Sequence, residues 1–287
     1  MIYLILNLLS SLYLQSDSSL IQIDKFGNFQ NASSISASRE EFIFVTDIQS
    51  NQIYKFSSSG EKLQNFGGPG FGNNELNYPV SIDASNGLDV FVSDYHNNRI
   101  QRYDLKLNYI ATFDFNIYNL TADASKKIYY PSGIVFLNTS EIFALADAGV
   151  YKVVKLKSLD EVSLFFGSNF GFDKLIKPKK IIKGTPLSLL ILDKESDEVV
   201  LFDNYGSFIR RIENSNTSPI ISIAFYYDNL YILYNQLLIS YDLKKGQYLG
   251  RFTYEIIENE TISDCTMLDQ KYFLVLTNKQ VFKFKFN

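Results

Sequence analysis

The sequence predicts an all-β protein: one six-bladed β-propeller closed by an N-terminal strand. The first observation is that a short apolar strand ending in Asp or Asn recurs along the chain. The six terminal residues, called markers below, are Asp47, Asp94, Asp147, Asp193, Asn235 and Asn278. Successive markers are 47, 53, 46, 42 and 43 residues apart, which is the period expected of propeller blades.

The second observation is that the segments around each marker have the content of a blade. A strand precedes the marker strand, and another follows it with an aromatic or aliphatic anchor. After a turn containing Gly or Asn, several repeats show a further strand. Marker and anchor are nine residues apart in blades one to four and six apart in blades five and six. We therefore expect a shorter loop in the last two blades.

Composition supports the same fold class. The chain has 20 Tyr and 24 Phe with no Trp, and aromatic side chains suit a pleated, half-buried surface. No stretch beyond the N-terminus shows a sustained helical period. A length of 287 residues fits one closed ring better than two separate domains.

The segment FGGPGFGNNELNYPVSIDASNGLDVFVSDYHNNRIQRYD, at 66–104, has a Gly-rich linker, a Pro-led strand, a strand ending in Asp, and an N-R-I-Q strand. In these features it resembles the NHL repeat family of the TolB-like six-bladed propeller group. The likeness is clearest over 42–115, and a second linker copy, FFGSNFGFDKLIKPKKI, extends it. The resemblance implies a six-bladed propeller, and it implies no single activity because propellers host unrelated functions.

The N-terminus differs from the strand pattern. Residues 2–14 form an apolar run too short to span a bilayer as a helix, with the length of a signal-peptide core. We expect residues 1–16 to be a signal peptide and 17–287 to be the propeller, which makes the protein secreted or periplasmic. The alternatives are an uncleaved anchor and a buried N-terminal strand, because the first basic residue is Lys25.

Ring closure is predicted from the two ends of the chain. The last blade ends at VFKFKFN without a fourth strand, whereas LIQID at 20–24 is a spare strand ahead of the first blade. We expect the N-terminal segment to complete blade six, which removes an open sheet edge.

Net charge argues against one class of partner, and the cysteine count excludes an intrachain disulfide. With 27 Lys and Arg against 31 Asp and Glu, the net charge is −4, which argues against general affinity for nucleic acid. The basic cluster Lys177, Lys179, Lys180 and Lys183 is interpreted as a solvated strand edge. Cys265 is the only cysteine, so it forms no intrachain disulfide, and we expect it to be buried as a small apolar side chain.

Candidate catalytic residues are few. His96 is the only histidine, so a Ser-His-Asp triad or a histidine metal site could use only this side chain, and we interpret it as a loop residue. The Asp markers could form a carboxylate ring for calcium. Their recurrence at one blade position favours a structural role, accepting loop N–H groups, with Arg99 as an ionic partner of Asp94. The run 67–72 lacks a phosphate-loop ending and is interpreted as a linker.

The predicted function is that of an exported, non-enzymatic binding or scaffold module for a protein, peptide or glycan. We expect a monomer with no cofactor, no metal, no nucleic-acid partner and no membrane span after signal removal. The alternative is a metal-dependent hydrolase or lactonase, or a lyase, with its site on the propeller axis.

The predicted binding face is the one where the loops after the markers and the linkers between blades emerge together. Aromatic and amide side chains there suit recognition, because they give contact area and adaptable hydrogen bonds. The predicted binding residues are Tyr95, His96, Asn97, Asn98, Asn74, Asn77 and Tyr78.

Overall fold

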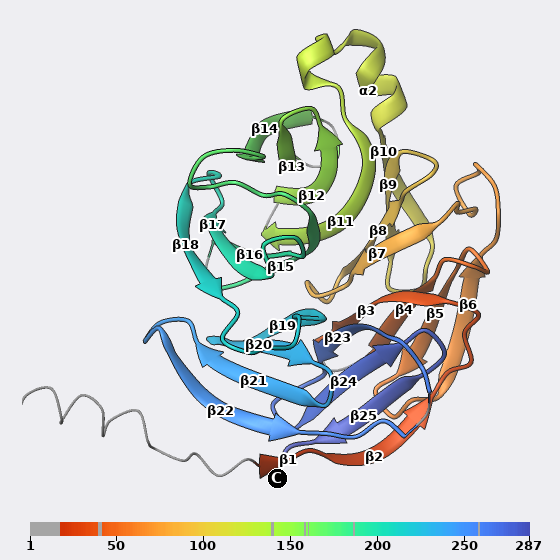
Figure 1. The fold of residues 1–287 in the computed structure, drawn as a ribbon. Helices are drawn as coiled ribbons and strands as arrows, with labels where there is room; N and C mark the ends of the chain where they lie inside the picture. Colours follow the sequence, from red (N-terminus) through yellow and green to blue (C-terminus); the bar gives the residue numbers. More distant parts are fainter. Residues whose placement is uncertain are drawn as a thin grey trace, which may run out of the picture.

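Six antiparallel sheets surround a central axis (Figure 1). The computed structural model describes residues 18–39, 42–138, 141–157, 159, 161–185, 187–257 and 259–287. Each sheet is one blade, and the first strands of successive blades contact one another around the axis. The predicted fold class, an all-β six-bladed propeller, is confirmed. The predicted signal segment, 1–16, lies outside the described residues. Among the described residues, no helix is long and apolar enough to cross a membrane.

The strands of each blade follow the order expected from the sequence. Blade one contains β3 (Ala32–Ser38), β4 (Phe42–Asp47), β5 (Gln52–Ser57) and β6 (Lys62–Gly67), and blade two contains β7 (Pro79–Asp83), β8 (Asp89–Asp94), β9 (Arg99–Asp104) and β10 (Tyr109–Asp114). Blade three contains β11 (Tyr129–Asn138), β12 (Glu141–Ala148), β13 (Tyr151–Lys157) and β14 (Glu161–Ser168), and blade four contains β15 (Pro178–Lys183), β16 (Ser188–Asp193), β17 (Glu198–Asp203) and β18 (Phe208–Glu213). Blade five contains β19 (Ser222–Tyr226), β20 (Asn229–Tyr234), β21 (Leu237–Asp242) and β22 (Gln247–Thr253), and blade six contains β23 (Ile262–Met267), β24 (Tyr272–Thr277) and β25 (Val281–Lys285).

All six markers lie at or next to the end of the second strand of a blade. The loops between second and third strands are shorter in blades five and six than in blades one, two and four, as the marker spacing predicts. Blade three differs: its loop, 149–150, is also short although its marker and anchor are nine residues apart. Second strands such as β8 and β16 are buried along their whole length, because neighbouring blades cover both faces. A strand buried on both faces reads as an almost continuous apolar run rather than an alternating one.

The core is divided among the spaces between blades. Six apolar clusters are present in the described residues, each formed mainly by two neighbouring blades. The cluster between blades two and three, for example, joins Phe91 and Ile100 to Ile142 and Val154. Blade-to-blade packing therefore buries the apolar side chains, and the axis itself is left to other residues.

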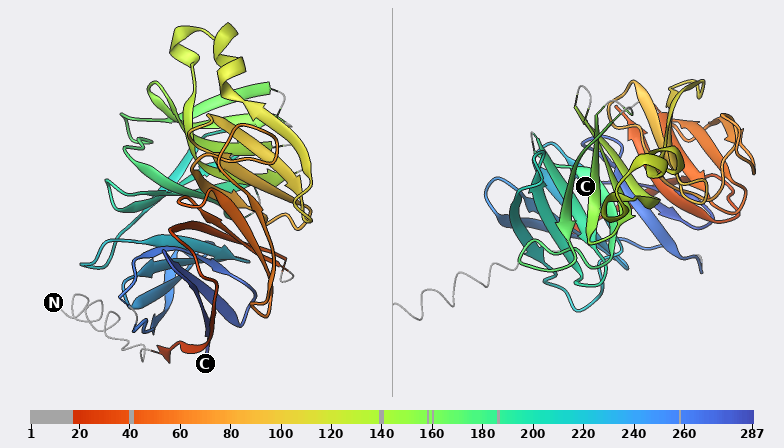
Figure 2. Two further views of the ribbon diagram at one scale, coloured as in Figure 1. Left: turned by 90° about the vertical axis from the view of Figure 1, so that its right-hand side faces the viewer. Right: turned by 90° about the horizontal axis from the view of Figure 1, so that it is seen from above.

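The N-terminal strand closes the ring as predicted. Strand β2 (Ile21–Phe26) pairs antiparallel with β25, with Ile21 opposite Lys285 and Phe26 opposite Val281. The sequence did not indicate β1 (Ser18–Ser19), which pairs in parallel with β22 of blade five. Figure 2 shows this N-terminal segment beside the C-terminus. The segment thus contacts two blades.

One element differs from the sequence-based expectation of no helix. A helix, α2 (Phe115–Thr121), and a 3₁₀ turn, Ala124–Lys126, lie between blades two and three and project from the ring (Figure 1). Asp114 caps the helix by accepting a hydrogen bond from the Asn116 N–H, and only Phe115 is buried. Two turns are too short to give a detectable helical period. The insertion explains why the interval from Asp94 to Asp147 is the longest.

Candidate functional site

In blades one, two, four and six, the marker side chain accepts hydrogen bonds from the linker that enters the same blade. Asp47 accepts hydrogen bonds from four backbone N–H groups, two in the preceding linker and two in its own loop. Asp193 accepts three such bonds. The markers Asp147 and Asn235 are exposed, and Asp147 Oδ1 lies 3.7 Å from Lys152 Nζ. For Asp47, Asp94 and Asp193, the structural role predicted from the recurrence agrees with these contacts, because their oxygens are occupied by groups of their own blade.

Asp94 has the predicted ionic partner. Arg99 Nε donates to Asp94 Oδ2 at 2.7 Å, and both side chains are buried. The Arg99 Nη atoms donate to the backbone carbonyls of Phe71, Gly72 and Glu75, at 2.7 to 3.0 Å. The run 67–72 is therefore an inter-blade linker held by Arg99, as predicted.

The loop after Asp94 and the linker ahead of β7 emerge side by side. The backbone N–H of Tyr95 donates to the carbonyl of Tyr78 at 3.3 Å, and that of His96 donates to the carbonyl of Asn77 at 3.1 Å. Asn77 also donates its own N–H to Asp94 Oδ1 at 2.6 Å. Loop and linker thus lie on one face, which we call the marker face.

Five aromatic rings gather on the marker face of blades two and three, and we call them the aromatic cluster. Its members are Tyr78, Tyr95, His96, Tyr129 and Tyr130. His96 stacks on Tyr78 with 4.6 Å between ring centroids, and Tyr95 stacks on Tyr130 with 5.2 Å. Tyr129 lies 6.2 Å from Tyr130. The exposed fractions of Tyr129 and Tyr130 are 41% and 50%, so the cluster presents ring surface to solvent.

The backbone fixes two of these tyrosines in an unusual conformation. Tyr78 and Tyr130 have φ values of +64° and +56°, in the left-handed region that bulky residues rarely adopt. Each is held by an asparagine of the preceding blade: Asn51 Oδ1 accepts the Tyr78 N–H at 2.7 Å, and Asn98 Oδ1 accepts the Tyr130 N–H at 2.8 Å. Asp197 makes the corresponding bond for blade five. These bonds are called inter-blade caps below, and those to Tyr78 and Tyr130 hold the backbone at both tyrosines.

Two predicted binding residues, Asn97 and Asn98, are buried, which leaves little of either side chain for direct contact with a ligand. Asn97 donates to the Gly70 carbonyl at 2.7 Å and to Asp94 Oδ2 at 2.8 Å. Asn98 is 6% exposed and forms the inter-blade cap to Tyr130. Both amides support the face from beneath, because a loop that leaves the sheet must satisfy its own polar groups.

The two remaining predicted residues differ in exposure. Asn77 is half-buried and donates its backbone N–H to Asp94, whereas Asn74 is exposed in the linker. The sequence reasoning missed Tyr129 and Tyr130. A signal was available: Tyr130 precedes Pro131 at the start of a first strand, as Tyr78 precedes Pro79.

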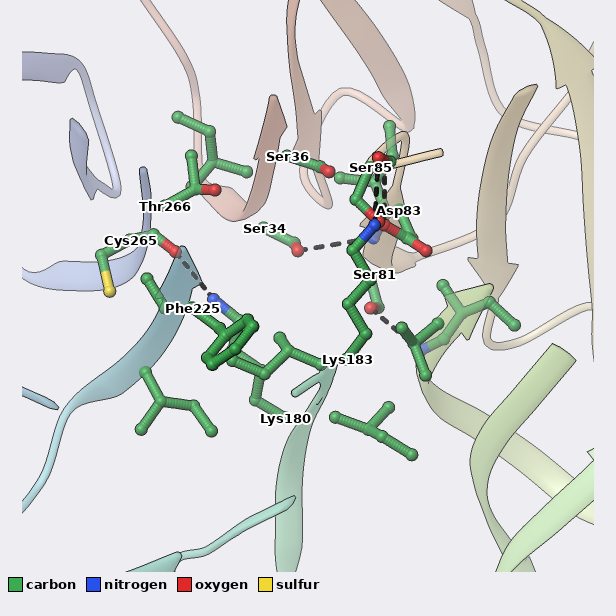
Figure 3. A pocket seen from close by; sticks show the side chains of 18 residues that line it. Ser34, Ser36, Ser81, Asp83, Ser85, Lys180, Lys183, Phe225, Cys265 and Thr266 are labelled. Atoms are coloured by element: carbon green, nitrogen blue, oxygen red, sulfur yellow. Dashed lines mark hydrogen bonds between the residues drawn. The ribbon is translucent and has the colours of Figure 1, made fainter. Parts of the chain in front are cut away.

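The axis is a narrow channel lined by the first strands (Figure 3). A cavity of about 480 Å³ opens from it on the marker face, and one of about 570 Å³ opens on the opposite face. Serine and lysine make up most of the lining of the cavity on the marker face, whereas isoleucine is the commonest residue along the channel. Asp83 is the acidic residue of the channel and Asp264 that of the cavity on the marker face. Among the residues that the structure describes, no three His, Cys, Asp or Glu side chains come together to hold a metal ion.

The basic cluster was placed correctly only in part. Strand β15 is an edge strand of its sheet, and Lys177 and Lys179 are exposed, as interpreted. That edge faces the channel, where Lys180 is half-buried. Lys180 donates to Asp264 Oδ1 at 2.5 Å, to Ser222 Oγ at 3.2 Å and to the Cys265 carbonyl at 2.8 Å. The reason is the position of β15 as the innermost strand of blade four, where an edge strand lines the axis.

Cys265 is buried and free, as predicted. Burial raises the pKa of its thiol to about 12. At neutral pH the thiol is protonated, and a protonated thiol is a poor nucleophile. The sulfur packs in the apolar cluster between blades five and six.

Comparisons with known proteins agree with the geometry. Residues 76–103, in blade two, match the NHL repeat family. A solved structure of streptogramin B lyase is similar to 92% of this chain and 97% of that one, with a TM-score of 0.64 and 13% identity. No curated protein matches the chain. In all, 1214 chains of solved structures match, so the fold is widespread and does not select an activity.

Proposed function

Because this chain carries an NHL repeat within a six-bladed β-propeller, we propose that it is an exported, non-enzymatic binding or scaffold module. It captures a protein, peptide or glycan partner on the marker face. The observation that carries the proposal is the aromatic cluster, in which exposed rings stack on one another across two blades.

Aromatic rings bind with a large contact area and few rotatable bonds, so little conformational entropy is lost when they are covered. Here the inter-blade caps reduce that loss further, because Tyr78 and Tyr130 are held at fixed backbone angles. A site held in its bound geometry gains affinity by avoiding the cost of ordering.

The test is capture from the extracellular fluid of the source, with the double variant Tyr95→Ala/Tyr130→Ala compared with the wild type. We expect the variant to lose at least tenfold in affinity, since truncating central aromatic residues removes most of an interface's binding energy. The matched control is Tyr248→Ala. Tyr248 is 43% exposed in the turn region on the opposite face.

Treatment of the captured material with protease or glycosidase identifies the class of partner. Equal capture by the wild type and Tyr95→Ala/Tyr130→Ala would contradict the proposed face. A stoichiometric metal in the purified protein, together with hydrolase or lyase activity that depends on it, would favour the axial-enzyme alternative.

A further inference from the structure

Five lysines of blade four are directed to the axis or its two mouths. Lys179, Lys180 and Lys183 lie on β15, Lys177 precedes that strand, and Lys194 lies in the loop after the marker Asp193. Figure 3 shows Lys180 and Lys183 in the channel, with Lys180 bonded to Cys265. All except Lys183 line the cavity on the marker face.

The charge of Lys180 is already balanced. Its ammonium group pairs with Asp264, which also accepts hydrogen bonds from Ser34 Oγ, Ser222 Oγ and the Ile35 N–H. Asp264 is the only acidic residue among those that line this cavity. Its charge also acts on Lys179, and that of Asp197 acts on Lys194, but one lining carboxylate cannot balance the four lysines of the cavity.

The other three lysines of this cavity, Lys177, Lys179 and Lys194, form no salt bridge within the described part of the chain. Lys179 Nζ reaches the Ser263 carbonyl at 3.4 Å, and Lys194 Nζ donates to the Ile220 carbonyl. Burial lowers the pKa of Lys179 and of Lys194, and for Lys194 the charge of Lys179 adds to the effect. Lys179 is accessible to water in the cavity, but the surrounding blades reduce its hydration. The cavity thus holds ammonium groups that repel one another.

Hydroxyl groups complete the lining. Five blades contribute serine side chains, each with one hydroxyl hydrogen to donate. These are Ser33, Ser34, Ser81, Ser132, Ser222 and Ser263. Ser34 and Ser222 donate theirs to Asp264, and Ser33 and Ser132 donate to backbone carbonyls, so Ser81 and Ser263 are the candidate donors to an anion. A cavity of about 480 Å³ is large enough for a small ligand.

We propose that this cavity binds a small molecule bearing a phosphate, sulfate or carboxylate group, with Lys179 and Lys194 as its charge partners. An anion there would relieve the repulsion between the lysines and receive hydrogen bonds from the lysine ammonium groups and from the Ser81 and Ser263 hydroxyls. None of the lining residues belongs to the aromatic cluster, so the site is independent of partner capture on the rim.

Calorimetric titration with sodium phosphate, sodium sulfate and sodium citrate tests the proposal, with sodium chloride at matched ionic strength as the reference. We expect saturable binding of at least one of these oxyanions. The double variant Lys179→Gln/Lys194→Gln should weaken it at least tenfold. Lys179→Arg/Lys194→Arg, which keeps both charges, should retain binding, and the three anions distinguish phosphate, sulfate and carboxylate recognition.

Two controls locate the site. Lys245→Gln removes an exposed lysine of the opposite face, and Lys183→Gln removes one from β15 outside this cavity; neither should change the affinity. No saturable binding of any of the three oxyanions, or equal affinity in the wild type and Lys179→Gln/Lys194→Gln, would overturn the proposal. Loss of binding in Lys183→Gln alone would also overturn it.

Discussion

At the scale of single residues, the same marker position has different surroundings in different blades. Asp94 is completely buried and paired with Arg99, whereas Asp147 is exposed beside Lys152. The sequence predicted the Asp94–Arg99 pair because both residues flank one loop. The exposure of Asp147 was not predictable, since it depends on how blade three turns after its second strand, where Gly149 and Val150 replace a four-residue loop.

This difference gives a matched pair of variants. Asp94→Asn should lower the free energy of unfolding by about 3 kcal/mol, because it leaves the Arg99 charge buried without a partner. Asp147→Asn should change it by less than about 0.5 kcal/mol, as expected for an exposed site. Urea unfolding measures both. Similar decreases in the free energy of unfolding for the two variants would show that the buried Asp94–Arg99 pair stabilises the protein no more than an exposed marker does.

The two lysines with lowered pKa values predict a pH dependence. Between their lowered folded-state pKa and the ordinary value of 10.5, the unfolded chain binds more protons than the folded chain. The stability contribution of these lysines therefore rises as pH increases through that window. Lys179→Gln/Lys194→Gln should be more stable than the wild type at pH 7, and this advantage should shrink toward pH 10.5.

Urea unfolding of both proteins over this range, at constant ionic strength, gives the comparison. Taking the difference between the two proteins cancels the effect of buried tyrosines, such as Tyr103 and Tyr254, whose pKa values burial raises. A difference that stays constant with pH would contradict the assignment.

At the scale of elements, the sequence predicted the positions of the strands. It predicted only in part which strand edges face the axis. The markers correctly located second strands because these are buried on both faces and read as apolar runs. Strand β15, with its sequence PKKIIK, reads as an exposed edge, and only the closed ring shows that the edge faces the channel. The tyrosines of the aromatic cluster belong to two blades. The repeated Tyr-Pro pair marks Tyr78 and Tyr130 in the sequence, but it does not show that residues of the two blades contact each other.

The closing strand gives a prediction about stability. A variant beginning at residue 27 lacks β1 and β2 and leaves β25 as an open edge of its sheet. Strand β25 carries the buried side chains Phe282 and Phe284. Partial exposure of these rings and loss of the strand pairing should cost about 3 kcal/mol or more. The open edge should also promote association.

The control is a variant beginning at residue 20, which keeps β2 and lacks only β1. Melting temperature and light scattering distinguish the two truncated proteins. If both melt at the same temperature as the longer chain and remain monomeric, β2 does not stabilise the ring.

At the scale of the whole molecule, the sequence was sufficient for blade number and closure, because both depend on repeats and on the two chain ends. It was insufficient for the site. The aromatic cluster depends on the positive φ angles of Tyr78 and Tyr130, and the cavity depends on side chains from several blades. Such assemblies arise only when the ring is closed.

Export also belongs to this scale. We expect the protein isolated from the source to be secreted or periplasmic, to begin near Asp17, and to be monomeric. Intact-mass measurement and size-exclusion chromatography test these expectations. A mass that includes residues 1–16 in the isolated protein would show that the segment is retained.

The inter-blade caps determine how this molecule could be divided into exchangeable parts. The asparagine that orients each tyrosine belongs to one sheet, and the tyrosine belongs to the next. Cutting the chain at sheet boundaries would separate the asparagine from the tyrosine, and the tyrosine backbone would no longer be held at its positive φ angle. A segment grafted into another propeller should therefore run from the loop after one marker through the first strand of the following blade, for example from Tyr95 to Asn138.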